Sequence, residues 1–334
     1  MNEQPNIAGK PVLTIARKRI LNLHSGFEEK LLCDGPTFTA GDACVYRCGF
    51  CYVPSMMQAK PPISTMLEKS GHSFEDVVIR REKPLDVLRE QLFHKNGKRK
   101  FTDPDDKRVV YASPLVDVAA TLELCRETME ICEMILENTA WQIRLLSKSS
   151  FLPIIANALD KYRARMIYGV STGTLDDLLA AAFEQGTALV SKRIHSLHKL
   201  QGEGFRTFGM ICPSLAYATP AGYHRFAEEA AAAIRVEQCE HVWAEVMNVR
   251  GESMIRTVKS LKDAGYEAEA SELFRVSTSP DAWEQYARHT FAAHCLFIPP
   301  EKLRFLQYVN KDNLDWWRAR EAYGAVLLGN LIHK

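Results

Sequence analysis

The stretch Cys44-Val45-Tyr46-Arg47-Cys48-Gly49-Phe50-Cys51-Tyr52 places three cysteines in a C-x3-C-x2-C arrangement. Iron–sulfur clusters are commonly held by four cysteine thiolates, so a cubane held by three would keep one iron open to a non-protein ligand. No further cysteine or histidine follows Cys51 closely, since the next histidine is His72. The spacing therefore predicts a cluster that performs chemistry beyond electron transfer.

Two plainer interpretations of the cysteine motif stay open at the level of sequence. The motif is also compatible with a structural zinc loop, although zinc sites usually require four ligands. Alternatively, the three cysteines are unrelated core residues, because free cysteine is often buried. A rival function of another class is that of a non-catalytic iron–sulfur or zinc-binding protein, such as an electron-transfer protein.

The length of 334 residues can be accommodated by a single α/β barrel. The 42 Lys and Arg residues nearly balance the 41 Asp and Glu residues, so the overall charge does not draw the chain to nucleic acid or anionic lipid. A nucleic-acid substrate would therefore need a local basic patch. The cysteine count of nine is odd, which disfavours a disulfide framework and suits reduced thiols.

The N-terminus, Met1 to Pro5, lacks a basic segment followed by an apolar core. No stretch approaches the ~18 consecutive apolar residues that a membrane-spanning helix needs. We expect a cytoplasmic protein without a membrane partner.

Short apolar, β-branched runs alternate with helical patterns, which predicts repeated βα units and a parallel sheet. The fold expected is α/β, a partial (β/α)6 TIM-type barrel with helical N- and C-terminal extensions. The boundaries predicted are an N-terminal extension over 1–34, a barrel core over 35–251 and a helical closure over 252–334, all within one integrated domain. The predicted strands cover 37–40, 109–113, 142–147, 166–172, 207–212 and 242–247.

Signals for helices and loops support this division. Apolar residues at spacings of four and three predict an amphipathic helix over 117–136, with Cys125 and Cys132 on its core face. Thr219 before Pro220 is typical of a helix start. The polar segment 95–107 is predicted to be an exposed loop before the second strand.

Active sites of parallel α/β barrels form at the carboxyl ends of the strands. The polar residues that end the predicted strands or follow them closely are Ser113, Asp117, Lys148, Ser171, Thr172, Cys212 and Asn248. The plain alternative for several of them is capping of the next helix. Glu245 lies within an apolar strand, so if it is buried it must be paired or hydrogen-bonded.

The cysteine motif resembles that of the radical S-adenosylmethionine (SAM) superfamily, C-x3-C-x-aromatic-C, with Phe50 in the aromatic place. The resemblance implies a [4Fe–4S] cluster on Cys44, Cys48 and Cys51. It also implies that SAM binds the open iron and is cleaved to a 5′-deoxyadenosyl radical that abstracts hydrogen from a substrate. An electron donor such as flavodoxin or ferredoxin would then be needed.

Further segments resemble the spore photoproduct lyase-like branch of that superfamily. They are Cys51-Tyr52, Ser147-Lys148-Ser149, Ser171-Thr172, Glu184 with Arg193, and Asn248-Val249-Arg250-Gly251. The resemblance covers roughly residues 35 to 255. The cofactor-binding candidates are Phe50, Tyr52, Ser113, Asp117, Lys148, Ser171, Thr172, Arg193, Glu245 and Asn248. Arg193 is expected either as a fork for the SAM carboxylate or as a surface helix residue.

The chain also departs from this branch. The usual Thr-Asp-Pro-Tyr-Gln segment after the second strand is replaced by Ala112-Ser113-Pro114-Leu115-Val116-Asp117. Cys212, at the end of the fifth predicted strand, is the best-placed thiol for a hydrogen donor, and a core position accounts for it equally well. The substrate therefore stays open between a nucleic-acid lesion and a small metabolite or peptide.

Overall fold

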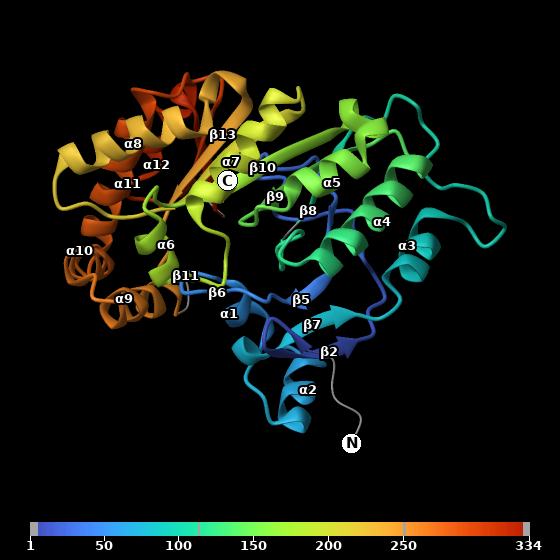
Figure 1. The fold of residues 1–334 in the computed structure, drawn as a ribbon. Helices are drawn as coiled ribbons and strands as arrows, with labels where there is room; N and C mark the ends of the chain where they lie inside the picture. Colours follow the sequence, from blue (N-terminus) through green and yellow to red (C-terminus); the bar gives the residue numbers. More distant parts are fainter. Residues whose placement is uncertain (1–5, 113, 250–251, 330–334) are drawn as a thin grey trace. The chain divides into compact units, whose positions relative to one another are not determined.

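The computed structural model describes residues 6–112, 114–249 and 252–329 (Figure 1). The chain divides into two compact units. The first comprises Met1–Glu28, Leu32–Arg47 and Cys51–Tyr168, and the second comprises Glu29–Leu31, Cys48–Phe50 and Gly169–Lys334. The division falls within strand β10 (Met166–Thr172) and within the cysteine motif.

Parallel strands form the centre of the first unit. β4 (Thr37–Phe38) pairs with β8 (Val109–Ala112), and β8 pairs with β9 (Gln142–Ser147), both in parallel register. β3 (Leu21–Asn22) joins β4 antiparallel. The helices that follow these strands are α4 (Leu122–Asn138) and α5 (Leu152–Ala158), with a 3-10 helix at Asp160–Arg165. The apolar strand sequences fit burial on both faces, as parallel strands require.

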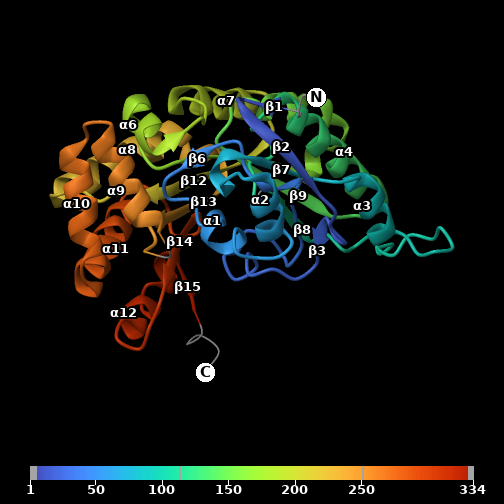
Figure 2. The ribbon, with the colours of Figure 1, turned by 90° about the horizontal axis from the view of Figure 1, so that it is seen from below.

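A second, four-stranded sheet in the first unit has the order β1-β2-β7-β5 (Figure 2). Its strands are β1 (Asn6–Ile7), β2 (Lys10–Ile15), β7 (Val78–Arg81) and β5 (Gly41–Ala43). The helices of this part of the chain are α1 (Val53–Met57), α2 (Ile63–Ser70) and α3 (Pro84–Leu92), with a 3-10 helix at Phe74–Asp76. Ile15, Ala43, Val53, Ile63 and Ile79 belong to one buried apolar cluster.

The prediction of a helical N-terminal extension is wrong. Residues 6–34, as far as the structure describes them, contain β1, β2 and β3 and no helix. The run Lys10–Ile15 pairs with β7, a strand more than sixty positions away, through Val12 opposite Val78. A partner so distant leaves no local periodicity from which the pairing could be predicted.

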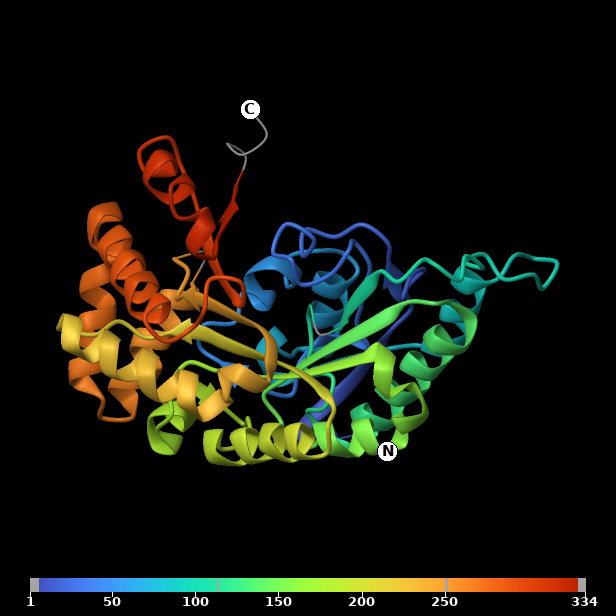
Figure 3. The same cartoon turned by 90° about the horizontal axis from the view of Figure 1, so that it is seen from above.

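The second unit continues the parallel strands with four elements after β10 (Figure 3). They are β12 (Arg206–Ser214), β13 (Cys239–Val246), β14 (Leu303–Tyr308) and β15 (Ala325–Leu328), each parallel to the next. The helices are α6 (Asp177–Phe183), α7 (Val190–Gly202), α8 (Pro220–Ile234), α9 (Ser253–Asp263), α10 (Glu267–Ser277), α11 (Pro280–Cys295) and α12 (Leu314–Arg318), with 3-10 helices at Val236–Gln238 and Glu321–Tyr323.

The C-terminal closure is only partly helical, which corrects the prediction for 252–334. β14 pairs with β13 through Leu303 opposite Val242, and β15 pairs with β14. The Phe305 ring stacks on Trp317 at 5.7 Å and meets Phe291 edge-on at 5.2 Å. This aromatic packing holds β14 against α11 and α12, and short apolar strands of this kind resemble buried helix segments in sequence.

The hydrogen-bonded strand order is β15-β14-β13-β12-β10-β9-β8-β4-β3, a largely parallel sheet of nine strands. The chain is therefore a mixed α/β protein, as predicted, while the barrel form stays a prediction. All six predicted strands are present, with bounds that differ by a few residues at most. Among the described residues, no helix is both long enough and apolar enough to cross a membrane.

The amphipathic helix predicted over 117–136 begins later than expected. α4 starts at Leu122, whose side chain is 45% exposed, because Thr121 caps the helix by accepting a hydrogen bond from the Leu124 N–H at 3.2 Å. Cys125 and Cys132 are buried, as predicted. The predicted start of α8 is confirmed, with Thr219 capping the helix at the Gly222 N–H.

Candidate functional site

The first cysteine of the motif directly follows β5 in the first unit. Burial, and then the charge of the Asp117 carboxylate, raises the pKa of the Cys44 thiol to about 12. The backbone N–H groups of Asp117 and Tyr46 donate hydrogen bonds to this sulfur and oppose the increase. Such N–H donors also stabilise thiolates that ligate iron. Cys51 precedes α1 and packs against the apolar cluster of the first unit.

The middle of the motif belongs to the second unit. Cys48 lies in β6 (Arg47–Cys48), and the Gly49 N–H donates to the Phe183 carbonyl at 2.8 Å. The Phe50 ring meets the Phe183 ring edge-on at 5.9 Å. A Cβ atom on Gly49 would lie 3.0 Å from the Thr257 Cα, so glycine permits the close approach of the loop to α9.

The donor set of the motif fits an iron–sulfur cluster. The three motif cysteines are half-buried free thiols, whereas Cys33, Cys125, Cys132 and Cys239 are buried. Within the part of the chain that the structure describes, no three His, Cys, Asp or Glu side chains form a group that could hold a metal ion. Three half-buried thiols on one short loop supply the ligand type that iron–sulfur clusters use, with each cysteine available to a different iron.

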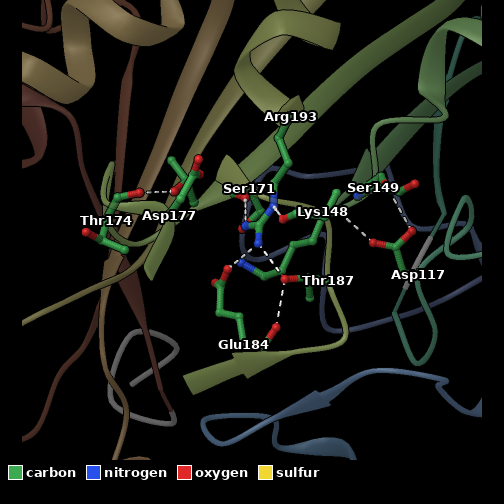
Figure 4. A network of polar contacts seen from close by, with 12 residues as sticks. Asp117, Lys148, Ser149, Ser171, Thr174, Asp177, Glu184, Thr187 and Arg193 are labelled. Atoms are coloured by element: carbon green, nitrogen blue, oxygen red, sulfur yellow. Dashed lines mark hydrogen bonds and ion pairs between the residues drawn. The ribbon is translucent and has the colours of Figure 1, made fainter. Parts of the chain in front are cut away.

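Asp117 connects the loops that follow two neighbouring strands of the first unit (Figure 4). Its carboxylate accepts hydrogen bonds from the Ser147 hydroxyl at 2.7 Å and from the Lys148 backbone N–H at 2.6 Å. It also accepts from the Ala119 N–H at 2.9 Å, so it shapes the loop and does not cap α4. Asp117 therefore positions both the backbone of Lys148 and its own N–H, which faces Cys44. Ser113 lies outside the described residues.

Tyr52 follows the third cysteine and keeps 44% of its surface exposed. Its hydroxyl donates to the Pro114 carbonyl in the loop after β8. The side chain thus ties the cysteine loop to the carboxyl end of a strand in the same unit. Its predicted contact with a cofactor stays a prediction.

A cavity of about 470 Å³ in the first unit is lined in part by residues at the carboxyl ends of β4 and β8. Phe27, Phe38 and Pro114 form part of its wall, and its cationic residues are Arg19 and Arg81. Arg81 is paired with Asp42 at 3.2 Å. Among the described residues, Arg19 makes no ion pair and is exposed. The cavity therefore presents a free guanidinium beside aromatic surface.

Arg193 is fully buried on α7 in the second unit, which corrects its interpretation as a surface residue (Figure 4). Its guanidinium pairs with Glu184 at 2.6 Å and donates to the carbonyls of Ala188 and Ser171 at 2.8 and 2.9 Å. It also donates to the Thr187 hydroxyl at 2.6 Å. With these partners and no exposed surface, Arg193 is not available as a fork for a SAM carboxylate. It holds the Ser171 backbone at the end of β10 instead.

Ser171 and Thr172 lie in the buried turn that this arginine holds. The Ser171 hydroxyl donates to the Cys212 carbonyl at 3.0 Å, which links β10 to β12. Thr172 is completely buried and its hydroxyl donates to the Thr174 carbonyl. The helix cap that follows is Asp176, so neither residue caps α6. Thr172 therefore has no exposed surface that a ligand could contact in this arrangement.

A second polar group of the same unit joins Cys212, Glu245 and Lys30. The Glu245 carboxylate lies 3.7 Å from the Lys30 Nζ and accepts from the Cys212 thiol, also at 3.7 Å. This pairing confirms that a carboxylate in an apolar strand finds partners. Burial by itself lowers the pKa of Lys30, but Glu245 and Tyr308 outweigh it and raise the pKa above its usual value. Cys212 is half-buried, so it is less enclosed than a core thiol.

Asn248 follows β13 and lines a cavity of about 580 Å³ in the second unit. Trp283, Tyr308 and Asp281 line the same cavity. The Asn248 carbonyl accepts from the Ser253 hydroxyl at 3.0 Å, which connects the segment to the start of α9. Arg250 and Gly251, the remainder of the predicted segment, lie outside the described residues.

Sequence reasoning missed Lys30, Tyr308, Arg19 and Lys10. Lys30 and Arg19 lie in the predicted N-terminal extension, and Tyr308 lies on the unpredicted strand β14. No local pattern marks any of them, because only the paired strands and packed loops bring them to their partners. Lys10 is a single lysine at the start of β2, and its sequence neighbours carry no motif.

Comparison with known proteins assigns the architecture. The chain has an α/β fold similar to that of spore photoproduct lyase, whose solved structures are among those that resemble it. Its complex with dinucleoside spore photoproduct has a TM-score of 0.57 at 11% identity, covering 86% of this chain and 80% of that one. A cysteine-to-serine variant of the lyase has a TM-score of 0.54 at 13% identity, covering 75% of this chain and 66% of that one.

A further variant of the lyase, solved with bound AdoMet and dinucleoside spore photoproduct, has a TM-score of 0.52 at 12% identity, with 75% and 66% of the two chains covered. The chain thus spans slightly less than two thirds of several of these neighbours. No family model and no curated protein sequence matches the chain. At these identities the likeness establishes the fold, and the predicted resemblance is confirmed at that level.

Proposed function

We propose that the chain is a radical SAM enzyme in which Cys44, Cys48 and Cys51 hold a [4Fe–4S] cluster with one iron open to SAM. The observation that carries the proposal is the loop of three half-buried thiols in a chain with the fold of spore photoproduct lyase. When bound, the cluster and SAM supply a 5′-deoxyadenosyl radical through one-electron cleavage of a C–S bond. A flavodoxin or ferredoxin would provide the electron.

The residues of the chain orient and enclose this chemistry. The N–H groups of Asp117 and Tyr46 stabilise negative charge on the Cys44 sulfur. Asp117 also fixes the backbone of Lys148, which together with Ser113, Ser171 and Asn248 is proposed to contact SAM. Arg193 is a positioning residue, because it reaches the site only through the Ser171 carbonyl. Phe50 and Tyr52 flank the third thiolate.

Cys212 is proposed as the hydrogen donor to the substrate radical. Its S–H group points at the Glu245 carboxylate, which Lys30 holds in place. A hydrogen bond to a fixed acceptor orients the thiol, and a half-buried position leaves one side accessible to a substrate.

The decisive experiment is anaerobic reconstitution of the full chain with iron and sulfide, followed by reduction and addition of SAM. We expect about four irons per chain, a broad visible absorption band and release of methionine and 5′-deoxyadenosine. Liquid chromatography with mass spectrometry measures both products. A protein that holds a complete cluster and leaves SAM intact would contradict the proposal, and zinc in place of iron would favour the structural metal site.

For the substrate, we propose an anionic molecule, with a nucleic-acid lesion as one member of that class. The supporting observation is the cavity of the first unit, where Arg19 is exposed beside the half-buried Phe27 and makes no ion pair among the described residues. A guanidinium next to aromatic surface suits phosphate contact combined with base stacking. The alternative, a small metabolite or peptide, needs no such cation.

Arg19→Met should weaken binding of an oligothymidylate single strand and reduce the slope of log affinity against log salt by about 1. The reason is that the variant removes one phosphate contact and its released counterion. Fluorescence anisotropy at several salt concentrations measures both quantities. Lys262→Met, a surface charge on α9 of the second unit, is the matched control and should leave the slope unchanged. If the original protein fails to bind the oligothymidylate even at low salt, the result supports a small metabolite or peptide as the substrate.

A further inference from the structure

Lys10 is a buried cation without a partner. The residue begins β2 in the four-stranded sheet of the first unit, and only 6% of its surface is exposed. Its Nζ atom makes no hydrogen bond or ion pair within the described residues. A buried ammonium left in this state is costly, because it loses hydration and receives nothing in exchange. Its position therefore calls for an anion.

Three acidic groups act on the charge of Lys10 and are the candidates for this anion. Cys44, Arg47, Glu75 and Asp76 all act on its charge. Burial, and then the repulsion from Arg47, lowers the pKa of Lys10, while Cys44, Asp76 and Glu75 oppose this effect. The two carboxylates are therefore the obvious rivals of Cys44 for the ammonium.

One of these two carboxylates, that of Asp76, already has partners of its own. The Asp76 carboxylate pairs with Arg47 at 2.7 Å and accepts from the Ser73 hydroxyl at 2.5 Å. This ion pair is exposed, with about half of each side chain open to solvent. The Glu75 carbonyl accepts from the Arg47 guanidinium at 3.4 Å. Arg47 thus neutralises the exposed Asp76 carboxylate. Lys10 pairs with Ile7 of β1, and Ile7 lines the same cavity as Cys44, which places the buried ammonium on the side of this sulfur.

We propose that Lys10 is the counter-cation of the Cys44 thiolate and tunes the reduction potential of the cluster. This inference rests on the proposed function, because it requires a cluster at Cys44. A [4Fe–4S]2+ core held by three thiolates is an anion, and uptake of one electron from a reductant makes it more negative without a proton or a broken bond. A buried ammonium next to one ligand favours the reduced form, since cluster potentials depend on net charge and burial.

The arrangement also connects the accessory sheet to catalysis. β2 and β5 both pair with β7, so the strand that carries Lys10 and the strand that leads into Cys44 are set by the same neighbour. Lys10 would thus act on the cluster through its charge and would not bind iron. A sheet separate from the nine-stranded, largely parallel sheet would then influence how readily the cluster accepts an electron.

The test is a potentiometric titration of the reconstituted full chain with titanium(III) citrate, in which the signal of the reduced cluster is measured by electron paramagnetic resonance. At the midpoint of the original protein, Lys10→Met should lower the ratio of reduced to oxidised cluster about tenfold, equivalent to about 59 mV for a one-electron couple. Lys10→Arg keeps the charge, so its ratio of reduced to oxidised cluster should stay within about twofold of that of the original protein. Lys18→Met removes an exposed charge of the same unit and should also stay within about twofold, because solvent screens it.

Each outcome has a defined meaning. Equal midpoints for the original protein and Lys10→Met would overturn the inference. If Lys10→Met fails to load iron while Lys10→Arg loads it, the anionic cluster depends on the charge, which supports the inference. Failure of both variants to load would assign Lys10 a purely structural role and overturn it. Absence of a cluster in the original protein, measured by iron analysis, is a failure of the proposed function and is thereby distinguished from these results.

Discussion

Cys48→Ala should lose the cluster and with it all measurable cleavage of SAM. Removal of one of only three thiolates leaves the cluster with two protein ligands. Two of its irons, the one that would bind SAM and the one that has lost Cys48, would then both lack a protein ligand. Substitutions of groups that merely support metal ligands already cost about 10- to 100-fold in affinity or activity, so loss of a ligand should cost at least this much. Iron and sulfide content, together with release of 5′-deoxyadenosine, measures the effect.

Cys295→Ala is the matched control for this experiment. Cys295 is also a half-buried free thiol, but it lies at the end of α11 and contacts the Tyr323 carbonyl at 3.8 Å. We expect the variant to retain its iron and its cleavage rate. If Cys48→Ala keeps a full complement of iron, or if both variants lose it equally, the three-cysteine motif is not the cluster site.

Arg193→Met should destabilise the second unit by about 3–5 kcal/mol, the usual cost of removing one partner of a buried ion pair. The Arg193 and Glu184 side chains have no exposed surface, so the Glu184 carboxylate would be left charged and desolvated. The hydrogen bonds to Ala188, Ser171 and Thr187 would be lost as well. The transition midpoint in urea, followed by far-ultraviolet circular dichroism, measures the change.

The control uses an ion pair of the same unit at the surface. Arg275 pairs with Glu272 on α10 at 2.6 Å, and 57% of the Arg275 side chain is exposed. Arg275→Met should cost only about 0–1 kcal/mol, because solvent screens the pair. The loss of stability in Arg193→Lys should lie between those of Arg193→Met and Arg275→Met, since lysine keeps the charge but cannot reach all the acceptors of the guanidinium. Equal midpoints for Arg193→Met and Arg275→Met would contradict the role assigned to the buried pair.

The central strands were predictable because their signals are local. The runs at 142–147 and 166–172 were predicted with the bounds of β9 and β10, since each is a short apolar stretch between polar turns. The strands β2, β5 and β7 were missed, and so were β14 and β15. Each of these is short and is stabilised by a partner far along the chain, so its own residues carry little information on the pairing.

The candidate site divides in the same way. The residue types at the strand ends pointed to Asp117, Ser171 and Glu245, and the structure gives each of them defined partners. The partners themselves were not predictable. The assignment of Arg193 failed because a helix position next to lysine and serine suggests the surface, whereas Glu184 and three oxygen acceptors enclose this side chain.

Sequence alone was enough to identify the cysteine motif, the alternation of strands and helices, and the strand ends where polar residues gather. These features depend on spacing over a few residues, which is the range over which ligand geometry and helical or strand periodicity act. The folded chain adds that Arg193 is a buried support, that Lys30 pairs with Glu245 and that the buried Lys10 Nζ makes no hydrogen bond among the described residues. Burial and charge pairing depend on segments that meet only after the chain has folded, so no local pattern records them.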